Sequence, residues 1–416
     1  MLTWVKIAVR NLLKNWRRSL FTLFAIAVGF AAVNVFGGFT EYIFQSLEES
    51  SIYAQGNGHL TVFKRGFLTD GKLDPLKFLL SREETARIMD ICRRQPGVLL
   101  LTGQLHITGL ISNGRASTIF LGVGRIPSEF YFIQKRASGV IGRLTLFDGR
   151  GLQDEVPYGV GLSVGLAAKL KLELGSDVIA MSPTVDGQIN ALDMQVFNTF
   201  HSPLEELDDK LIQVPLQFAQ ALYDTSSVDR ITILLEDNNL TTNLRSILEK
   251  SLGENGHDVD IIAWQELSPF YTKVKNMFDV IFVFLFIIVL VIVVMSVINT
   301  IGMSIMERTR EIGTLRALGL KRRGVIRLFT IESILLGVSG SLVGLLLTLL
   351  SWFLVKLYEP SWVPPNIPRR VPLEVFLVPR YMLMSFVFLM ALSIASALLP
   401  TRKAAHAGIV DALGHV

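Results

Sequence analysis

The 416-residue chain has one cysteine and little charge. Cys92 has no second cysteine to pair with, so an intrachain disulfide cannot stabilise the fold. Charged residues make up 18% of the sequence and hydrophobic residues 50%, and the mean hydropathy is +0.46. This composition is too apolar for one soluble protein of this length and indicates a membrane protein.

The sequence also lacks the motifs of nucleotide and metal sites. Residues 66–72 approach a phosphate-binding loop, but Leu73 stands where a Ser or Thr would hold magnesium. Gly159-Val-Gly161 is too weak a motif for a dinucleotide site, and the six histidines and Cys92 show no metal-ligand spacing. We therefore expect no cofactor or metal in this chain. The pI near 9.1 needs no nucleic acid, because the basic residues flank membrane segments.

Four apolar stretches are long enough to cross a bilayer. A helix rises 1.5 Å per residue, so about 20 apolar residues cross a hydrocarbon core of about 30 Å. Basic residues beside these stretches put the N terminus, the turn between the second and third spans and the C terminus in the cytoplasm. The expected order is an amphipathic interfacial helix (1–18), a first span (19–39), an extracytoplasmic α/β domain with stalk helices (40–277), a second span (278–305), a cytoplasmic coupling helix (306–327), a third span (328–357), a short outer loop (358–379), a fourth span (380–400) and a cytoplasmic tail (401–416).

The N-terminal region carries five basic residues and no acid before residue 19, which is typical of a helix at the inner membrane face. A cleaved signal peptide is the rival interpretation. The apolar run at 19–39 is long for a signal peptide, and 40–51 continues it as a polar helix. We therefore expect an uncleaved first span.

Two features of the third span concern helix packing. A Gly-x-x-x-Gly pair at 340–344 allows a close helix contact, which we expect to lie within the chain. Glu332 is an acid inside the span and needs the interface or a basic partner. Arg327 or Arg323 is the expected partner.

The region between the first two spans has a mixed α/β pattern. Alternating apolar residues and turn signals indicate strands, and amphipathic stretches indicate helices. The expected strands are 59–63, short runs broken by glycine within 99–121, 177–181, 195–200 and 231–235, and the expected helices are 83–94, 163–172 and 240–252.

One motif in this region matches the nucleophile elbow of serine hydrolases, Gly161-Leu-Ser163-Val-Gly165. An elbow needs a buried strand before the serine, and Pro157 argues against a strand there. His201 and His257 follow in the order of a catalytic triad. We expect instead that Ser163 begins a helix as its cap, and we predict no catalytic residue. A membrane-tethered hydrolase remains an alternative.

The most specific segment lies between the second and third spans. It reads Glu-Arg-x-x-Glu-Ile-Gly-x-Leu-Arg-Ala-Leu-Gly from Glu307 to Gly319, with seven basic residues between Arg308 and Arg327. Helical spacing separates a polar side from an apolar side, and Gly319 is placed to end the helix. The polar side consists of Glu307, Arg308, Arg310, Glu311 and Thr314, and the apolar side of Ile305, Ile312, Leu315 and Leu318.

This segment resembles the signature of the FtsX-like permeases, the MacB/LolC/LolE group of ABC transporters. The endings Leu399-Pro400…Ala405 and 409–413 and the span layout are also similar to that family. The resemblance implies a helix that docks on an ATPase. The implied docking residues are Glu307, Arg308, Arg310, Glu311, Thr314, Arg316, Leu318 and Gly319.

The resemblance further implies a transporter subunit without enzymatic activity of its own. Because no ATPase is fused here, the chain is most similar to LolC/LolE-like permeases of the bacterial inner membrane. The implied partners are two copies of an ABC ATPase, which bind ATP and Mg, a second permease copy or a paralogue, membrane lipids and a periplasmic lipoprotein carrier. Extraction or export of a lipoprotein or other hydrophobic substrate is the implied function, and regulation of an envelope enzyme by mechanotransmission is the alternative.

An aromatic-rich collar is expected where the first two spans leave the membrane. Aromatic side chains favour that interface, and an acyl chain entering sideways needs an apolar groove. The predicted substrate-facing residues are Phe30, Asn34, Phe36, Phe39, Met277, Phe278 and Phe282.

Overall fold

The computed structural model describes residues 2–71, 75–137, 147–202, 205–363, 370–406 and 408. The chain divides into two compact units. The first comprises Met1–Ile43, Lys275–Pro360 and Leu373–Val416, and the second comprises Phe44–Val274 and Ser361–Pro372. Residues 72–74, next to the phosphate-loop motif, and the 409–413 motif lie outside the described residues.

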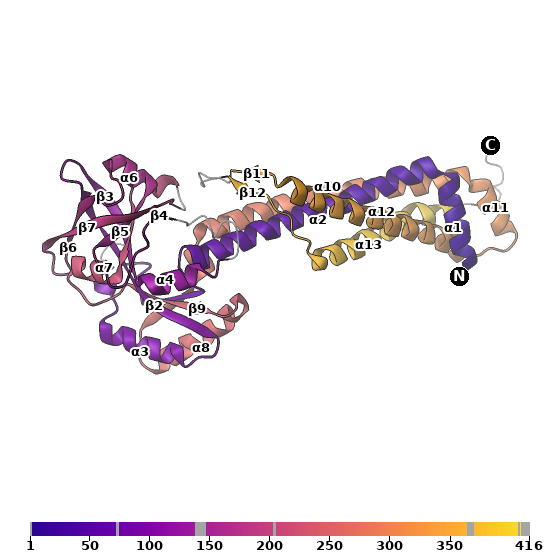
Figure 1. Cartoon of the computed structure of the whole chain (residues 1–416). Helices are drawn as coiled ribbons and strands as arrows, with labels where there is room; N and C mark the ends of the chain where they lie inside the picture. Colours follow the sequence, from indigo (N-terminus) through magenta and orange to yellow (C-terminus); the bar gives the residue numbers. More distant parts are fainter. Residues whose placement is uncertain are drawn as a thin grey trace. The chain divides into compact units, whose positions relative to one another are not determined.

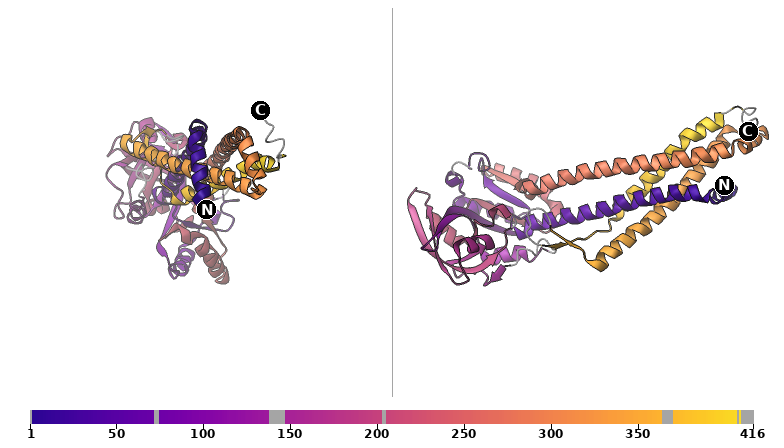
Figure 2. Two further views of the ribbon diagram at one scale, coloured as in Figure 1. Left: turned by 90° about the vertical axis from the view of Figure 1, so that its right-hand side faces the viewer. Right: turned by 90° about the horizontal axis from the view of Figure 1, so that it is seen from above.

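The first unit consists of helices, seen from three directions in Figures 1 and 2. They are α1 (Leu2–Lys14), α2 (Trp16–Glu49), α10 (Pro269–Glu307), α11 (Thr309–Ala317), α12 (Arg322–Tyr358) and α13 (Pro379–His406). Within the described part of the chain, α2, α10, α12 and α13 are the four helices long and apolar enough to cross a membrane. The predicted fold class, four transmembrane helices with a mixed α/β domain, is confirmed.

Two helix boundaries differ from the sequence prediction. The lead helix ends at Lys14, and α2 begins at Trp16, so residues 1–18 do not form one helix. The last helix continues through Pro400 to His406, into the segment predicted as a tail. Just after the proline, the Thr401 hydroxyl donates to the Ala397 carbonyl (2.6 Å) within the same helix.

The glycine pair of α12 packs against α2, as the spacing predicted. A methyl group at Gly340 would lie 2.7 Å from Ile26 Cβ, and one at Gly344 would lie 2.7 Å from Phe30 Cβ. Ile26 and Phe30 are buried in the core of this unit. The two helices therefore approach as closely as they do because neither glycine has a side chain.

The second unit contains a sheet covered by short helices. Its strands are β1 (Leu60–Lys64), β2 (Val98–Ser112), β3 (Ser117–Arg125), β4 (Phe147–Gly149), β5 (Gly159–Ser163), β6 (Asp177–Pro183), β7 (Ile189–Phe200), β8 (Leu211–Pro215), β9 (Arg230–Leu235) and β10 (Val259–Ala263). Its α-helices are α3 (Arg82–Arg93), α4 (Pro127–Gln134), α6 (Val164–Leu170), α7 (Leu216–Tyr223), α8 (Thr241–Glu254) and α9 (Trp264–Leu267). The described strands join in the order β10-β1-β9-β2-β3-β8-β5-β7-β4, with β6 pairing to β2 and β7.

Strand β2 belongs to both halves of this sheet. Its first part pairs with β9 beside the core that α3 and α8 complete, and its second part pairs with β3 and β6 over a core shared with α6 and α7. The prediction that glycines break this region into short strands was wrong. Gly103 and Gly109 lie within β2, where they give room to Val228 and to the Met181 backbone.

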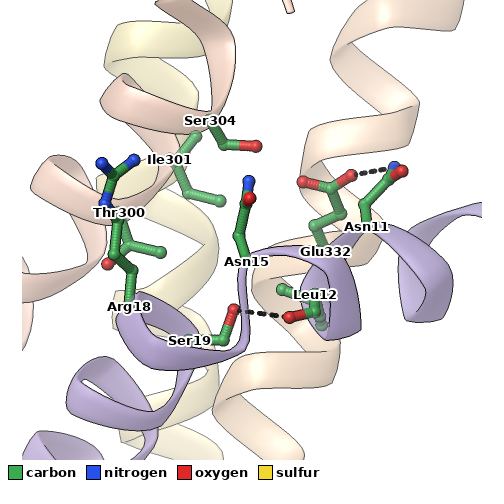
Figure 3. Close-up of a pocket in the computed structure, with 9 residues that line it drawn as sticks. All are labelled: Asn11, Leu12, Asn15, Arg18, Ser19, Thr300, Ile301, Ser304 and Glu332. Atoms are coloured by element: carbon green, nitrogen blue, oxygen red, sulfur yellow. Dashed lines mark hydrogen bonds between the residues drawn. The ribbon is translucent and has the colours of Figure 1, made fainter. Parts of the chain in front are cut away.

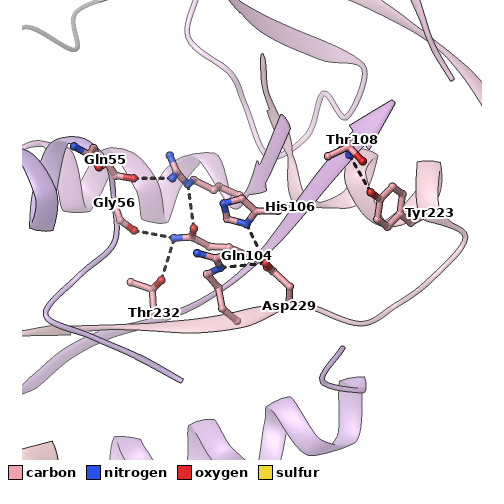
Figure 4. Close-up of polar contacts among 10 residues, drawn as sticks. Gln55, Gly56, Gln104, His106, Thr108, Tyr223, Asp229 and Thr232 are labelled. Carbon is pink, nitrogen blue, oxygen red and sulfur yellow. Dashed lines mark hydrogen bonds and ion pairs between the residues drawn. The ribbon is translucent and has the colours of Figure 1, made fainter. Parts of the chain in front are cut away.

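A buried polar cluster lies where these two halves share β2 (Figure 4). Asp229 accepts from the Arg230 guanidinium at 2.9 Å and lies 3.0 Å from His106 Nδ1. Burial raises the pKa of Asp229, but Arg230 and His106 outweigh it, so the pKa lies below its ordinary value. Burial, with Arg230 nearby, lowers the pKa of Arg125 to about 9. Gln104 completes the cluster by donating to the Gly56 carbonyl at 2.8 Å.

The positions of the basic residues predict that Lys321 faces the cytoplasm and Ile189 the opposite side. We expect Lys321→Cys to react with an impermeant thiol reagent only after permeabilisation of spheroplasts. Ile189→Cys, at a site 83% exposed, should react without permeabilisation. Labelling of Lys321→Cys in intact spheroplasts would show that the predicted topology is wrong.

The background for this experiment is Cys92→Ala. Cys92 is fully buried, and burial raises the pKa of its thiol to about 12, so the native thiol should stay unlabelled. Alanine is preferred to serine because a hydroxyl at this buried place would need a new hydrogen-bond partner. The unmodified chain serves as the control, because it shows whether Cys92 itself reacts with the reagent.

The close contact of α12 with α2 predicts that Gly344→Val destabilises the first unit. Overpacking of this kind costs about 1–3 kcal/mol, because Phe30 or the helix backbone must move. Thermal unfolding in detergent measures the effect. Gly302→Val is the matched control, since a methyl group there meets no atom within 4 Å. Equal unfolding temperatures for the two variants would contradict the packing argument.

Candidate functional site

Helix α11 is separated from the second span by a backbone break at Arg308. Arg308 precedes the helix with φ −116° and ψ 15° and makes no side-chain cap. At the other end, the Leu320 N–H donates to the Leu315 carbonyl (3.0 Å) and the Gly319 N–H to the Arg316 carbonyl (3.1 Å). This is a Schellman motif, and Gly319 adopts the left-handed φ of 101° that it requires. The predicted end of the helix at Gly319 is confirmed.

The outer face of α11 mixes charge with apolar surface. Arg310, Glu311 and Thr314 are exposed. Leu318 is 80% exposed, whereas Ile312 is buried in the core of the unit. Arg316 is half-buried. A helix with this face is suited to bind a protein surface, because it offers charged groups for hydrogen bonds around an apolar contact.

Arg308 does not lie on that face, contrary to the pattern in the sequence, and Glu307 is exposed but paired. Glu307 forms an ion pair with Arg18 and accepts from Asn15 Nδ2 at 3.2 Å. The side chain of Arg308 is only 11% exposed and reaches Glu332. The break at Arg308 turns the Arg308 side chain toward the helix bundle, whereas Glu307, the last residue of α10, stays 41% exposed.

Glu332 is the centre of the polar contacts at this end of the unit (Figure 3). Its carboxylate is 1% exposed and accepts from Arg308 Nη1 at 3.1 Å and from Asn11 Nδ2 at 2.7 Å. The sequence-based choice of Arg327 or Arg323 as partner was wrong, because Arg308 occupies that place.

A small polar cavity adjoins Glu332. Its volume is about 10 Å³, roughly one water molecule. The residues around it come from the lead helix and the first three spans, and they are Asn11, Leu12, Asn15, Arg18, Ser19, Thr300, Ile301, Ser304 and Glu332. The helix ends at this site therefore meet through polar groups as well as apolar packing.

The predicted aromatic collar forms in part. Phe36 of α2 lies 6.0 Å from Phe278 and 6.2 Å from Phe282 of α10, and Phe39 lies 6.1 Å from Phe278, measured between ring centroids. Met277 is 52% exposed beside them.

Phe30 and Asn34 belong to the bundle interior instead. Phe30 is 2% exposed against Gly344. Asn34 is 4% exposed and donates to Ser385 Oγ at 2.9 Å. Neither side chain is available to a substrate at the surface, because the helix turns both toward α12 and α13.

An apolar groove of about 440 Å³ opens beside this collar. Its walls come from α2, α10 and α13, and its polar groups lie at the start of α13. The Tyr381 hydroxyl there donates to Glu41 at 3.0 Å. The residues around the groove are Val33, Phe282, Phe286, Val289, Arg380, Tyr381, Met384, Ser385, Phe388 and Leu389.

Ser163 lies between a strand and a helix, but not as a nucleophile. Ser163 ends the buried strand β5, and α6 follows; Pro157 lies before β5, so it did not prevent a strand at the serine. Its side chain is fully buried, and its Oγ lies 2.6 Å from the Asp208 carbonyl and 3.0 Å from the Leu211 carbonyl. Ser163 precedes α6 but makes no side-chain cap there.

The buried hydroxyl predicts that Ser163 serves stability. A fluorophosphonate probe should leave the chain unlabelled, because the oxygen is inaccessible and no base contacts it among the hydrogen bonds above. Ser163→Ala should lower the free energy of unfolding by about 1 kcal/mol through the lost hydrogen bond. Labelling that disappears in Ser163→Ala would instead establish a hydrolase.

The C-terminal part of the chain matches a family model. Residues 283–409 match "FtsX-like permease C-terminal", a region that contains most of α10 and all of α11, α12 and α13. The macrolide export ATP-binding/permease protein MacB of Escherichia coli is 34% identical over 119 residues, which are 29% of this chain and 17% of MacB. An uncharacterized ABC transporter permease of Methanocaldococcus jannaschii is 25% identical over 211 residues, 49% of this chain and 50% of that one. The chain thus spans half or less of the length of these relatives.

Two solved structures are similar to about half of the chain. The periplasmic region of MacB from Actinobacillus actinomycetemcomitans is 16% identical, covers 56% of this chain and 98% of its own, and has a TM-score of 0.37. The extracellular domain of the noncanonic ABC-type transporter YknZ from Gram-positive bacteria is 15% identical, covers 49% and 100%, and has a TM-score of 0.35. Over residues 283–409 the chain is thus similar to FtsX-like permeases, and over 119 residues it is similar to MacB.

Proposed function

We propose that this permease converts ATP hydrolysis by a separate ABC ATPase into work on a substrate at the outer face of the inner membrane. The observation that carries the proposal is α11, an exposed charged helix held between two spans by a Schellman turn. In the proposed assembly, two ATPase copies bind ATP and Mg, and each docks on the α11 of one of two permeases. The second permease is another copy of this chain or a paralogue.

Two helices supply a route for the motion. Helices α2 and α10 each have one end in the first unit and the other in the second. Neither is broken within its span, and α2 is followed directly by a short π-helix, Ser50–Ala54. A displacement of the cytoplasmic ends therefore has a continuous hydrogen-bonded path to the second unit, without a substrate pore through the bundle.

The apolar groove supports a substrate with a hydrophobic part, such as a lipoprotein, passed on to a periplasmic carrier in the manner of LolC/LolE-like permeases. Its apolar walls suit an acyl chain, and Arg380 at one end suits an anionic or polar head. The alternative function is regulation of an envelope enzyme. It would use the same motion through α2 and α10, but it gives the groove no role.

The docking role of α11 predicts that Arg310→Glu and Gly319→Val uncouple the ATPase. Arg310 lies on the exposed face, and valine at φ 101° strains the Schellman turn. We expect co-purification with the ATPase to weaken about tenfold, equal to about 1.4 kcal/mol of contact energy. Glu359→Lys, a charge change at the other end of α12, is the control. Full ATPase binding by both α11 variants would refute the docking assignment.

The groove predicts that a photocrosslinker at Phe282 captures substrate. In membranes reconstituted with the ATPase and a lipoprotein, we expect a crosslink to the lipoprotein that ATP abolishes. A crosslinker at Phe353, an exposed residue on α12, reports contact with bulk lipid. If both positions yield only lipid while transport proceeds, the substrate does not use this groove.

A further inference from the structure

The carboxylate of Glu332 lies three turns inside α12, where an unpaired charge is costly. Its side chain is 1% exposed. Such a group persists in a membrane helix only where a cation and hydrogen-bond donors satisfy it. Its partners therefore indicate which helices must stay together at this end of the bundle.

The cation comes from the residue at the break between α10 and α11. Arg308 Nη1 lies 3.1 Å from Glu332, and Arg308 Nε lies 3.1 Å from Glu311 on α11. The guanidinium also lies 5.8 Å from the centre of the Phe329 ring on α12. One side chain thus joins the first turn of α11 to α12.

The neighbouring residue makes the opposite connection. Glu307 pairs with Arg18 at the start of α2 and accepts from Asn15 between α1 and α2. Asn11 of α1 donates to Glu332 at 2.7 Å. Of the two consecutive residues at the break, Arg308 therefore ties α11 to α12, and Glu307 ties the end of α10 to the lead helix and first span.

The backbone leaves the direction of α11 open. Arg308 is not helical, and no side chain caps the first turn of α11. The angle between α10 and α11 therefore depends on side chains: the Thr309 hydroxyl, which donates to the Ile305 carbonyl at 3.0 Å, the buried Ile312, and Arg308 with its partners.

We propose that Glu332, with Arg308 and Asn11, is a positioning site that fixes the direction of α11 and transmits its displacement to α12 and α1. The inference rests on the proposed function for its role in transport. Its structural part, the orientation of α11, is testable without any ATPase.

Replacement of the pair by apolar residues separates positioning from stability. A buried ion pair exchanged for well-packed apolar residues is often neutral in stability, because the cost of removing the charges from water disappears with them. A purely structural pair therefore predicts that Arg308→Met/Glu332→Met keeps both fold and function. A positioning pair predicts that this double variant keeps the fold and loses the direction of α11.

The first measurement is a distance distribution between nitroxide labels at Leu318→Cys and Leu342→Cys, in the Cys92→Ala background. Both positions are exposed, one on the C-terminal end of α11 and one on α12. We expect a single narrow distribution in the native pair and a broader one in Arg308→Met/Glu332→Met. Arg327→Met, an exposed cation in the same segment, is the control and should leave the distribution narrow. An unchanged distribution in the double variant overturns the proposal.

The second measurement uses the complex with the ATPase. We expect the double variant to retain ATPase binding, since the exposed face of α11 is intact, and to lose substrate-stimulated hydrolysis about tenfold or more. Unchanged stimulation would overturn the transmission role. If the native chain itself binds no ATPase, the proposed function fails, whereas the label distances still decide whether Glu332 orients α11.

A second variant that keeps the ion pair tests the proposal even if the double variant does not fold. Asn11→Leu removes one donor from Glu332 and leaves Arg308 in place. We expect an intermediate broadening of the label distances and a partial loss of stimulation. Native values for both quantities in a folded Asn11→Leu protein would exclude Asn11 from the site.

Discussion

The end of the first unit that carries α1 and α11 depends on the neutralisation of one buried carboxylate. A bilayer supplies neither water nor counterions to Glu332, so the cation must come from the protein. Arg308 can supply it only if the helix of the second span stops before it and the chain turns inward. The break between α10 and α11 accompanies that contact, and so do the hydrogen bonds from Asn11 to Glu332 and from Asn15 to Glu307.

This arrangement separates two kinds of charge on one short segment. Arg308 is turned into the bundle, and Arg310 and Glu311 remain at the surface. In the proposed positioning site Arg308 sets the direction of α11, and the surface residues face outward. Glu311 also forms an ion pair with Arg308, so the surface residues and the internal residue are in contact. A displacement of Glu311 by a partner would therefore also displace Arg308.

Much of this architecture was predictable from local signals, and the remainder depends on long-range pairing. Apolar length predicted the four spans, and Gly319 predicted the end of α11, because both follow from a few adjacent residues. Helical spacing misassigned Arg308, since it assumes an unbroken helix. The choice of Arg327 for Glu332 failed for the same reason, and the inward turn of Phe30 and Asn34 depends on α12 and α13, which no local pattern describes. Short elements such as β5 and α7 escaped prediction because their few apolar residues gain their structure from distant strands.

The sharing of β2 between two cores has a consequence for how the second unit opens. A strand that ended at Gln104 would let each half of the sheet melt by itself, as separate cooperative units do. Here the backbone of β2 continues from one core into the other, and the charged cluster of Asp229, Arg230 and His106 lies at the crossing, with Asp229 buried and the other two partly exposed. Local unfolding of either half therefore exposes that cluster to solvent and loosens the other half. Amide hydrogens along the whole strand should then exchange with solvent water in one common event.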